Sequence, residues 1–308
     1  MATKLSETET ITPVAQPKKA RQKSANITER WMLMPSVILL AIISFIPLFY
    51  MIYSSFMNYM INPDQPTFYH FHNWAVTFHD SAFWLSWGRT ATYAISGLVL
   101  EFLLGTALAL AIYRLPWGQN IVTTIWMLPL FVAPIVTGLL GRFLVNSTYG
   151  LYAWVLQLLG VHTEILGNTL TAMPALILMD MWEWTPLITI IVLAGLQAMP
   201  EEPLEAADVD GAHYWDKLRY VILPLIARPL LVAVLVRSMD ILRYVDTIMI
   251  TTEGGPADAT KTIGYYLVQI AFQFQDFGRA AAVGLTMLVI TILIGQLFVR
   301  AFTRGEQQ

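Results

Sequence analysis

Four charged residues recur at steps of three in an otherwise apolar segment, and their types suit them to binding. They are Arg237, Asp240, Arg243 and Asp246. Residues three apart in a helix are neighbours, so each guanidinium can pair with the next carboxylate. A charge at the centre of a membrane-spanning helix costs roughly 2.5–3.5 kcal/mol on insertion scales, so these groups must be paired and face the protein interior or a water-filled cavity. The pattern fits structural ion pairing, substrate contact in a cavity, or a proton pathway.

A second group of candidate binding residues lies in the apolar segment 173–197. Trp182 and Trp184 offer indole rings that can stack on the C–H face of a sugar, and Glu183 between them can accept hydrogen bonds from hydroxyls. Asp180 and Glu101 could supply further partners for the arginines. The candidate substrate pathway therefore consists of Trp182, Glu183, Trp184, Arg237, Asp240, Arg243, Tyr244 and Asp246.

The sequence lacks the motifs of the common catalytic sites. It contains no cysteine, which excludes thiol nucleophiles, disulfides and Cys–zinc sites. It has no G-x-x-x-x-G-K-[ST] motif, so this chain does not hydrolyse ATP, and neither G-x-S-x-G nor H-E-x-x-H occurs. His70, His72 and His79 are loosely spaced without an acidic cluster, so we expect solvated histidines and no metal. We expect a non-enzymatic chain that itself binds no cofactor.

The elements that position these residues are predicted to be membrane-spanning helices. Hydrophobic residues make up 56% of the 308 residues and charged residues 13%, against about 25% charged in soluble domains. A spanning helix needs roughly 20 mostly apolar residues. Six segments qualify: 32–56, 90–113, 121–143, 173–197, 230–250 and 281–302. Pro129 and Pro134 predict a kink in the third. The net charge of −3 excludes a strongly basic nucleic-acid binder.

The distribution of lysine and arginine predicts the orientation. Residues 1–30, a basic tail that we expect to be disordered, carry Lys4, Lys18, Lys19, Arg21, Lys23 and Arg30. Further basic residues follow the second span, occupy residues 204–229 and end the chain. Because basic residues favour the cytoplasmic side and six spans return the chain to the side where it began, we expect both termini in the cytoplasm.

The polar stretch LEAADVDGAHYWDKLRYVILPLIARP, residues 204–229, separates two apolar segments. Residues 204–209 favour a helix, and Gly211 permits a break with positive φ. An apolar face then recurs at helical spacing in Tyr214, Leu218, Val221, Ile222 and Leu225. Pro224 and Pro229 are expected to end this helix and start the next span. The periodicity fits a helix lying on the lipid surface, or one that offers a surface to a cytoplasmic partner.

The same stretch resembles the EAA signature of permease subunits in ATP-binding-cassette importers. The matching residues are Glu205, Ala206, Ala207, Gly211, Leu223 and Pro224. Asp210 and Ala212 give the DGA form typical of the carbohydrate branch, which GLQAMPEE (195–202), WEWTP (182–186) and TTEGGP (251–256) also resemble. The resemblance covers residues 30–302 and is to first permeases for maltose, trehalose, glycerol-3-phosphate and related compounds. The first outer loop is too short for the large extra periplasmic domain of the maltose-type first subunit.

The resemblance implies a type I importer permease fold over residues 31–303, with residues 201–229 as the loop that couples to the ATPase. The coupling residues would be Glu205, Ala206, Ala207, Asp210, Gly211, Ala212, Tyr214, Trp215, Leu218 and Pro224. Gly254, Gly255 and Pro256, which locally favour a simple turn, would lie near the binding protein and the gate.

The implied partners are a second homologous permease, two ATP-binding subunits that carry ATP and Mg, and an extracytoplasmic solute-binding protein. A carbohydrate would be the substrate, and the bacterial inner membrane the location. The alternative is an ion-coupled secondary transporter that uses the charges of the fifth span. That alternative predicts internal repeats between the two halves, which the sequence does not display, and requires no cytoplasmic hairpin.

Overall fold

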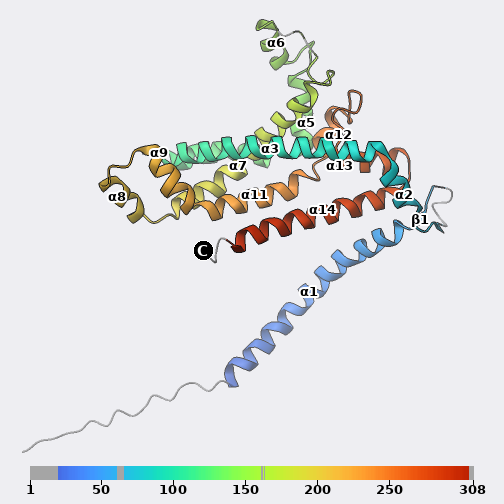
Figure 1. Ribbon diagram of the computed structural model, residues 1–308, viewed down its shortest axis with the longest axis horizontal. Helices are drawn as coiled ribbons and strands as arrows, with labels where there is room; N and C mark the ends of the chain where they lie inside the picture. The colour runs from blue at the N-terminus through green and yellow to red at the C-terminus, as the bar shows by residue number, and fades with distance from the viewer. Residues whose placement is uncertain (1–19, 61–65, 161, 163, 305–308) are drawn as a thin grey trace, which may run out of the picture. The chain divides into compact units, whose positions relative to one another are not determined.

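The computed structural model describes residues 20–60, 66–160, 162 and 164–304, and most of them are helical (Figure 1). The chain divides into two compact units at Tyr50 and Met51. The first consists mainly of helix α1 (Ala20–Ser54). Residues 1–19 of the tail predicted to be disordered lie outside the described residues, and α1 begins inside that predicted tail at Ala20.

The second unit contains a small hairpin and a series of helices. In order, they are β1 (Met57–Asn58), β2 (Thr67–Phe68), α2 (His72–His79), α3 (Ser81–Tyr113), α4 (Gln119–Trp126), the 3-10 helix η1 (Leu128–Phe131), α5 (Pro134–Leu144), α6 (Leu151–Leu158), α7 (Ala172–Gln197), α8 (Glu202–Val209), α9 (Tyr214–Lys217), the π-helix η2 (Leu218–Ile222), α10 (Leu223–Leu225), α11 (Ala227–Ile241), α12 (Asp246–Thr251), α13 (Ile263–Val268), the π-helix η3 (Gln269–Gln273) and α14 (Phe277–Arg304). Strands β1 and β2 are antiparallel, with Met57 opposite Phe68.

Among the described residues, four helices are long and apolar enough to cross a membrane. They are Trp31–Ser54, Ser81–Tyr113, Ala172–Gln197 and Phe277–Arg300. Two bent pairs also qualify: Gln119–Phe131 with Pro134–Leu144, and Tyr214–Leu225 with Ala227–Ile241. The predicted number of six spans is reached only if each bent pair counts as one span.

In the third predicted span, 121–143, the structure has a sharp bend where the sequence predicted a kink. Its two halves meet at 92°. Pro134 opens α5, and the residue before it, Ala133, has extended backbone with φ −67° and ψ 138°. A proline disfavours helical conformation in the preceding residue, so the sequence Ala133–Pro134 separates the halves.

The prediction of one continuous helix over the fifth span, 230–250, is wrong. Helix α11 ends at Ile241, residues 242–245 are irregular, and α12 begins at Asp246. The four regularly spaced charges therefore do not share one helix surface. Arg237 and Asp240 belong to α11, Arg243 lies in the break, and Asp246 opens α12.

The core of the second unit is built on the long contact between α3 and α7, with α11 packed against both (Figure 1). Gly105 permits the close approach, because a Cβ atom there would lie 2.9 Å from Cγ2 of Ile188. One buried cluster joins α3 and α7 to the segment 218–226, and a second joins them to the end of α11 and to α12. The α3–α7 pair is therefore the frame that holds the other elements.

A polar clasp fastens the first turn of α3 to α13 and α14. Asp80 caps α3 by accepting a hydrogen bond from the Ala82 N–H at 2.8 Å, and its other carboxylate oxygen accepts from the Tyr266 hydroxyl at 2.7 Å. Arg279 of α14 forms an ion pair with the same carboxylate. Partial burial raises the pKa of the Asp80 carboxyl, but hydrogen bonds from Tyr266, Ala82 and Arg279 outweigh burial and hold the pKa below its ordinary value.

We predict that Asp80→Asn destabilises the protein in a pH-dependent way. Because the folded pKa of Asp80 is lowered, its contribution is present above the unfolded pKa of about 3.9 and is lost as the pH falls through the folded value. After allowance for solvent screening, we expect the substitution to lower the free energy of unfolding by about 1 kcal/mol at pH 7, which corresponds to a fall of roughly 2–4 °C in Tm. This difference should become smaller as the pH falls from 7 to 3 in thermal unfolding of the detergent-solubilised protein.

The matched control is Asp216→Asn, which neutralises an exposed carboxylate in α9. Its difference from wild type should be small and should not change with pH. A constant Asp80→Asn penalty from pH 3 to pH 7 would contradict the ionic role of Asp80.

Candidate functional site

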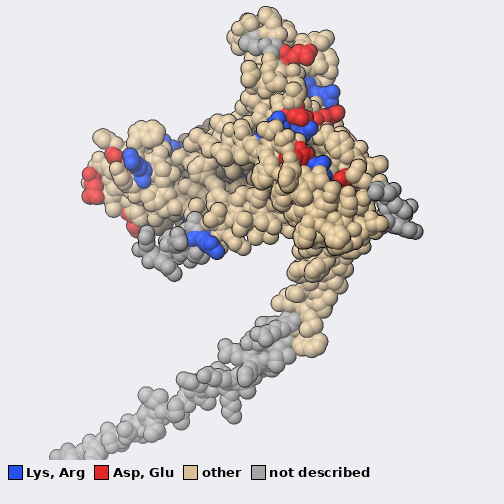
Figure 2. Space-filling model, turned by 45° about the vertical axis from the view of Figure 1, so that its right-hand side comes forward, with Lys and Arg blue, Asp and Glu red and all other residues tan. Residues whose placement is uncertain are grey.

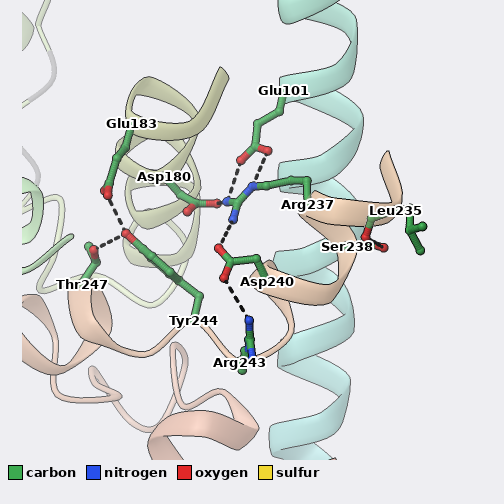
Figure 3. A network of polar contacts seen from close by, with 10 residues as sticks. All are labelled: Glu101, Asp180, Glu183, Leu235, Arg237, Ser238, Asp240, Arg243, Tyr244 and Thr247. Atoms are coloured by element: carbon green, nitrogen blue, oxygen red, sulfur yellow. Dashed lines mark hydrogen bonds and ion pairs between the residues drawn. The ribbon is translucent and has the colours of Figure 1, made fainter. Parts of the chain in front are cut away.

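The charged residues of the spans converge on one guanidinium. Arg237 of α11 is fully buried and binds Glu101 of α3 through two parallel hydrogen bonds (Figure 3). Its Nε atom donates to Oε2 at 2.7 Å and its Nη2 atom to Oε1 at 2.9 Å. This bidentate geometry is the strong form of an arginine–carboxylate pair, and it fixes α11 against α3.

Two further carboxylates complete the network. Arg237 Nη2 donates to Asp180 Oδ2 of α7 at 2.5 Å, and Nη1 donates to Asp240 Oδ2 at 3.1 Å (Figure 3). The other oxygen of Asp240 lies 3.7 Å from Arg243 Nη2. The Trp184 ring adds a cation–π contact, with its centroid 4.9 Å from Arg237 Cζ. One buried cation therefore joins α3, α7 and α11.

Gly97 makes room for this network one turn before Glu101. A Cβ atom at Gly97 would lie 2.8 Å from Cδ1 of Ile241 and 3.6 Å from Oδ2 of Asp180. The glycine thus lets α7 and the end of α11 approach α3 where the charges meet.

The burial of this charged network determines whether its side chains can contact a solute. The side chains of Arg237, Glu101 and Asp180 are all 0% exposed. Because none of these side chains is accessible, a solute in a cavity could not contact them. Of the three alternatives, which were structural ion pairing, substrate contact and a proton pathway, the geometry supports structural ion pairing. Removal of one partner would leave a buried uncompensated charge, which is strongly destabilising.

A second polar network ties the helix break to α5 and α7. The Tyr244 hydroxyl donates to Glu183 Oε2 at 3.0 Å and lies 2.7 Å from Thr247 Oγ1 (Figure 3). Thr247 Oγ1 is in turn 3.1 Å from the carbonyl oxygen of Pro134. Glu183 and Tyr244, both predicted to line the substrate pathway, are buried in this network.

Three predicted pathway residues are exposed: Trp182, Arg243 and Asp246. Trp182 is 49% exposed and lines a cavity of about 640 Å³ between α5, α6 and α7. The cavity wall is mostly aliphatic, with polar groups from Thr137, Thr171 and Tyr152. Its volume and composition are those of a small-molecule site.

The polar stretch forms a hairpin, Glu202–Lys217, made of α8, a tight turn and α9. The turn is a Schellman motif, in which Gly211 N–H donates to Asp208 O at 3.1 Å and Ala212 N–H to Ala207 O at 2.9 Å. Gly211 has φ +71°, so the predicted positive-φ break is confirmed. Lys217 and Asp208 form an ion pair that joins the two helices.

The segment after the hairpin, Leu218–Ile226, is its stem. Ile222 and Ile226 are buried in a cluster with residues of α3 and α7, and Leu218 packs against it. The prediction that Pro224 ends the helix is wrong: helical structure continues to Leu225, and the chain bends at Ile226 by 65°. The π-helix η2 ends just before Leu223 and Pro224, and Leu223 N–H donates to Leu218 O.

Of the residues predicted to form an apolar face, Ile222 is buried, Tyr214, Leu218 and Val221 are half-buried, and Leu225 is 42% exposed. The hairpin's outer surface combines acidic and apolar side chains. Exposed residues include Glu205, Ala206, Asp210, Gly211 and Trp215, all predicted to couple to a partner. Of the others predicted to couple, Pro224 is exposed, and Ala207, Ala212, Tyr214 and Leu218 are half-buried.

The TTEGGP stretch, residues 251–256, is a compact turn, as predicted. Gly254 has φ +79°, and a Cβ atom there would lie 2.8 Å from the Tyr265 ring, so this position requires glycine on both counts. Thr260 closes the turn by donating its backbone N–H to Gly254 O at 3.1 Å and its hydroxyl to Gly255 O at 2.7 Å. Pro256 follows in the same turn. Within the described ranges, no group of three or more His, Cys, Asp or Glu side chains could hold a metal ion.

Sequence reasoning missed Gly97 and Thr247. The spacing of Gly97 one helical turn before Glu101 was a usable signal, since a small residue beside a buried charge permits close helix packing. Thr247 carried no such signal, because its contacts come from α5 and from the helix break.

The chain resembles known proteins in both sequence and fold. The family model described as binding-protein-dependent transport system inner membrane component matches residues 101–305. The trehalose/maltose transport system permease protein MalF of Thermococcus litoralis is 33% identical over 79% of this chain and 82% of its own length. The sulfoquinovosyl glycerol transport system permease protein SmoG of Agrobacterium fabrum is 29% identical over 87% and 88% of the two chains.

Solved structures share the fold. A bacterial ABC transporter involved in the import of the acidic polysaccharide alginate matches with a TM-score of 0.78 and 22% identity, over 92% of this chain and 99% of the other. The alginate transporter in complex with its alginate pentasaccharide-bound periplasmic protein gives a TM-score of 0.76 and 21% identity, over 89% and 94%. The family match covers both the buried network and the hairpin, and with the apolar helices it identifies the chain as a multi-pass inner-membrane protein that belongs to the binding-protein-dependent transport system inner membrane components.

Proposed function

We propose that this chain is a permease subunit of an ATP-driven importer for a sugar or sugar derivative, and that the hairpin Glu202–Lys217 couples it to ATP-binding subunits. The observation that carries the proposal is the hairpin itself. It is held in shape by a Schellman turn and an ion pair, packed through its stem on α3 and α7, and exposed on its outer surface.

The position of the hairpin supports this role. The hairpin lies at one end of the α3–α7 frame (Figure 1). Acidic and basic side chains gather at that end and in a second group farther along the bundle, and the surface between the two groups is largely uncharged (Figure 2). This distribution suits an apolar bundle in lipid with a polar hairpin in water. The Lys and Arg distribution favours the cytoplasm for this end and for both termini.

The proposed partners follow from the family. They are a second permease subunit, two ATP-binding subunits with their ATP and Mg, and an extracytoplasmic binding protein that meets the outer face near Gly254–Pro256. The alginate transporter was solved with a periplasmic protein, which supports the last of these. Closure of the ATP-binding subunits would displace the hairpin and switch the permease pair between inward-facing and outward-facing states.

Carbohydrate is the proposed substrate class. The relatives named above are permeases for trehalose/maltose and sulfoquinovosyl glycerol. In this chain, Trp182 supplies an exposed indole at the edge of an uncharged cavity with hydroxyl groups, which suits a sugar ring. Arg243 and Asp246, exposed at the helix break, are further candidates for contact with hydroxyls. The ion-coupled alternative is not favoured, because Arg237 and its carboxylate partners Glu101 and Asp180 are fully buried.

Gly211→Pro is predicted to uncouple the transporter. Proline holds φ near −65° and lacks an N–H, whereas Gly211 has φ +71° and donates to Asp208. We expect the protein to reach the membrane and the assembled complex to hydrolyse ATP, while uptake in proteoliposomes falls at least about tenfold, equivalent to roughly 1.4 kcal/mol.

The matched control is Gly160→Pro. Gly160 also has positive φ, +83°, and its N–H donates to Gln157 O after α6, far along the chain from the hairpin. This variant should keep most of its uptake. Normal uptake in Gly211→Pro would refute the coupling role of the hairpin.

Trp182→Ala is predicted to weaken substrate use, because it removes the exposed indole of the cavity. We expect about a tenfold rise in KM for uptake, equivalent to roughly 1.4 kcal/mol, and a smaller rise for Trp182→Phe. Trp117→Ala, which removes an 84% exposed indole beyond α3, is the control and should leave KM unchanged. Equal effects of the two alanine variants would argue against a substrate contact at Trp182.

Arg237→Ala is predicted to destabilise the fold rather than alter substrate affinity. It leaves Glu101 and Asp180 buried without their cation, at a cost of roughly 3–5 kcal/mol. The yield of monodisperse protein in size-exclusion chromatography should collapse. Arg243→Ala should leave the yield intact, because that side chain is 68% exposed and 3.7 Å from Asp240. A stable Arg237→Ala protein with a raised KM would favour a substrate role instead.

A further inference from the structure

The contact between the hairpin and the inner end of α3 includes one aromatic–cation stack. Arg114 is the C-cap of α3, and its Cζ atom lies 3.5 Å from the centroid of the Tyr214 ring. Tyr214 is the first residue of α9, directly after the Schellman turn. A cation at the carboxyl end of a helix is favoured by the helix dipole, so Arg114 is held where it can cover the ring.

This stack differs from the other contacts of the hairpin. The ion pair of Lys217 with Asp208 lies within the hairpin, and the buried contacts of Ile222 and Ile226 belong to the stem. The Arg114–Tyr214 stack instead connects the hairpin's second helix to the helix that bears Glu101. Arg114 and Glu101 are thirteen residues apart on α3, or about 20 Å along its axis.

We propose that Arg114 is a positioning residue that transmits displacement of the hairpin to α3 by holding the Tyr214 ring. The proposal rests on the coupling role proposed above. With the stack in place, a push on the hairpin moves α3 together with α7 and α11. Without it, the hairpin remains attached through its stem and through Leu204 of α8, which packs on the same apolar cluster, but α3 receives the push only through apolar packing.

The test uses the transporter assembled with its partner subunits in proteoliposomes, and measures solute imported per ATP hydrolysed. Arg114→Ala and Tyr214→Leu should each lower this ratio about three- to tenfold. Tyr214→Phe keeps the ring and should retain the wild-type ratio. Arg114→Lys should restore it only in part, because an ammonium lacks the flat face that stacks on a ring.

The double variant Arg114→Ala/Tyr214→Leu tests whether the two residues act through their contact with each other. If the stack is the cause, the double variant should be no worse than either single variant. Arg219→Ala is the matched control: its guanidinium lies 5.7 Å from the Tyr220 centroid within η2, an exposed cation–π contact that does not reach α3. That variant should keep the wild-type ratio.

Co-purification of the ATP-binding subunits separates the possible failures. Retained subunits with a lowered ratio support transmission by Arg114. Retained subunits with an unchanged ratio in Arg114→Ala overturn the inference and leave the coupling role of the hairpin intact. Loss of the subunits from Arg114→Ala also overturns it, since the arginine would then serve docking. A wild-type protein that brings down no ATP-binding subunit would instead refute the proposed function.

Discussion

The buried guanidinium of Arg237 sets the constraint on which the rest of the membrane region depends. Its five N–H groups can be satisfied only by acceptors in fixed directions. Glu101, Asp180 and Asp240, which lie on three helices, accept four hydrogen bonds from the guanidinium. Arg237, Glu101 and Asp180 are fully buried and cannot exchange a partner for water, so a shift of one helix would leave a buried charge without its partner. The network therefore fixes the register of α3, α7 and α11 more strictly than apolar side chains could.

Helix α3 carries this constraint from one end of the bundle to the other. It spans 33 residues, or about 50 Å. Asp80 fastens its first turn to α13 and α14, Glu101 fastens its middle to α11, and Arg114 meets the hairpin at its last turn. Because polar contacts at three levels hold one continuous helix, α3 is suited to connect the two ends of the bundle.

The sequence was informative where the relevant contacts are local. Steps of three predicted the pairing of Asp240 with both Arg237 and Arg243, which the structure confirms, and Gly211 marked the turn correctly. It was uninformative where partners are distant: Glu101 lies 136 residues from Arg237, and nothing in the spacing selects it. The break at 242–245 was also missed, because neither glycine nor proline interrupts the apolar pattern there. The contacts of Tyr244 with Glu183 and Thr247 hold that break, and tertiary contacts have no local signature.

The same network limits where the protein can bend. Helices α3, α7 and α11 share buried charges, so relative motion among them would separate ions at high cost. Three sharp interruptions of the helices lie away from Arg237 or at the edge of its network: the 92° bend before Pro134, the 65° bend at Ile226 and the break at 242–245. At the break at 242–245, Arg243 and Asp246 are exposed six and nine residues beyond the buried Arg237. A helix frame held by buried charges and a helix break that carries exposed charged side chains therefore adjoin within a few residues.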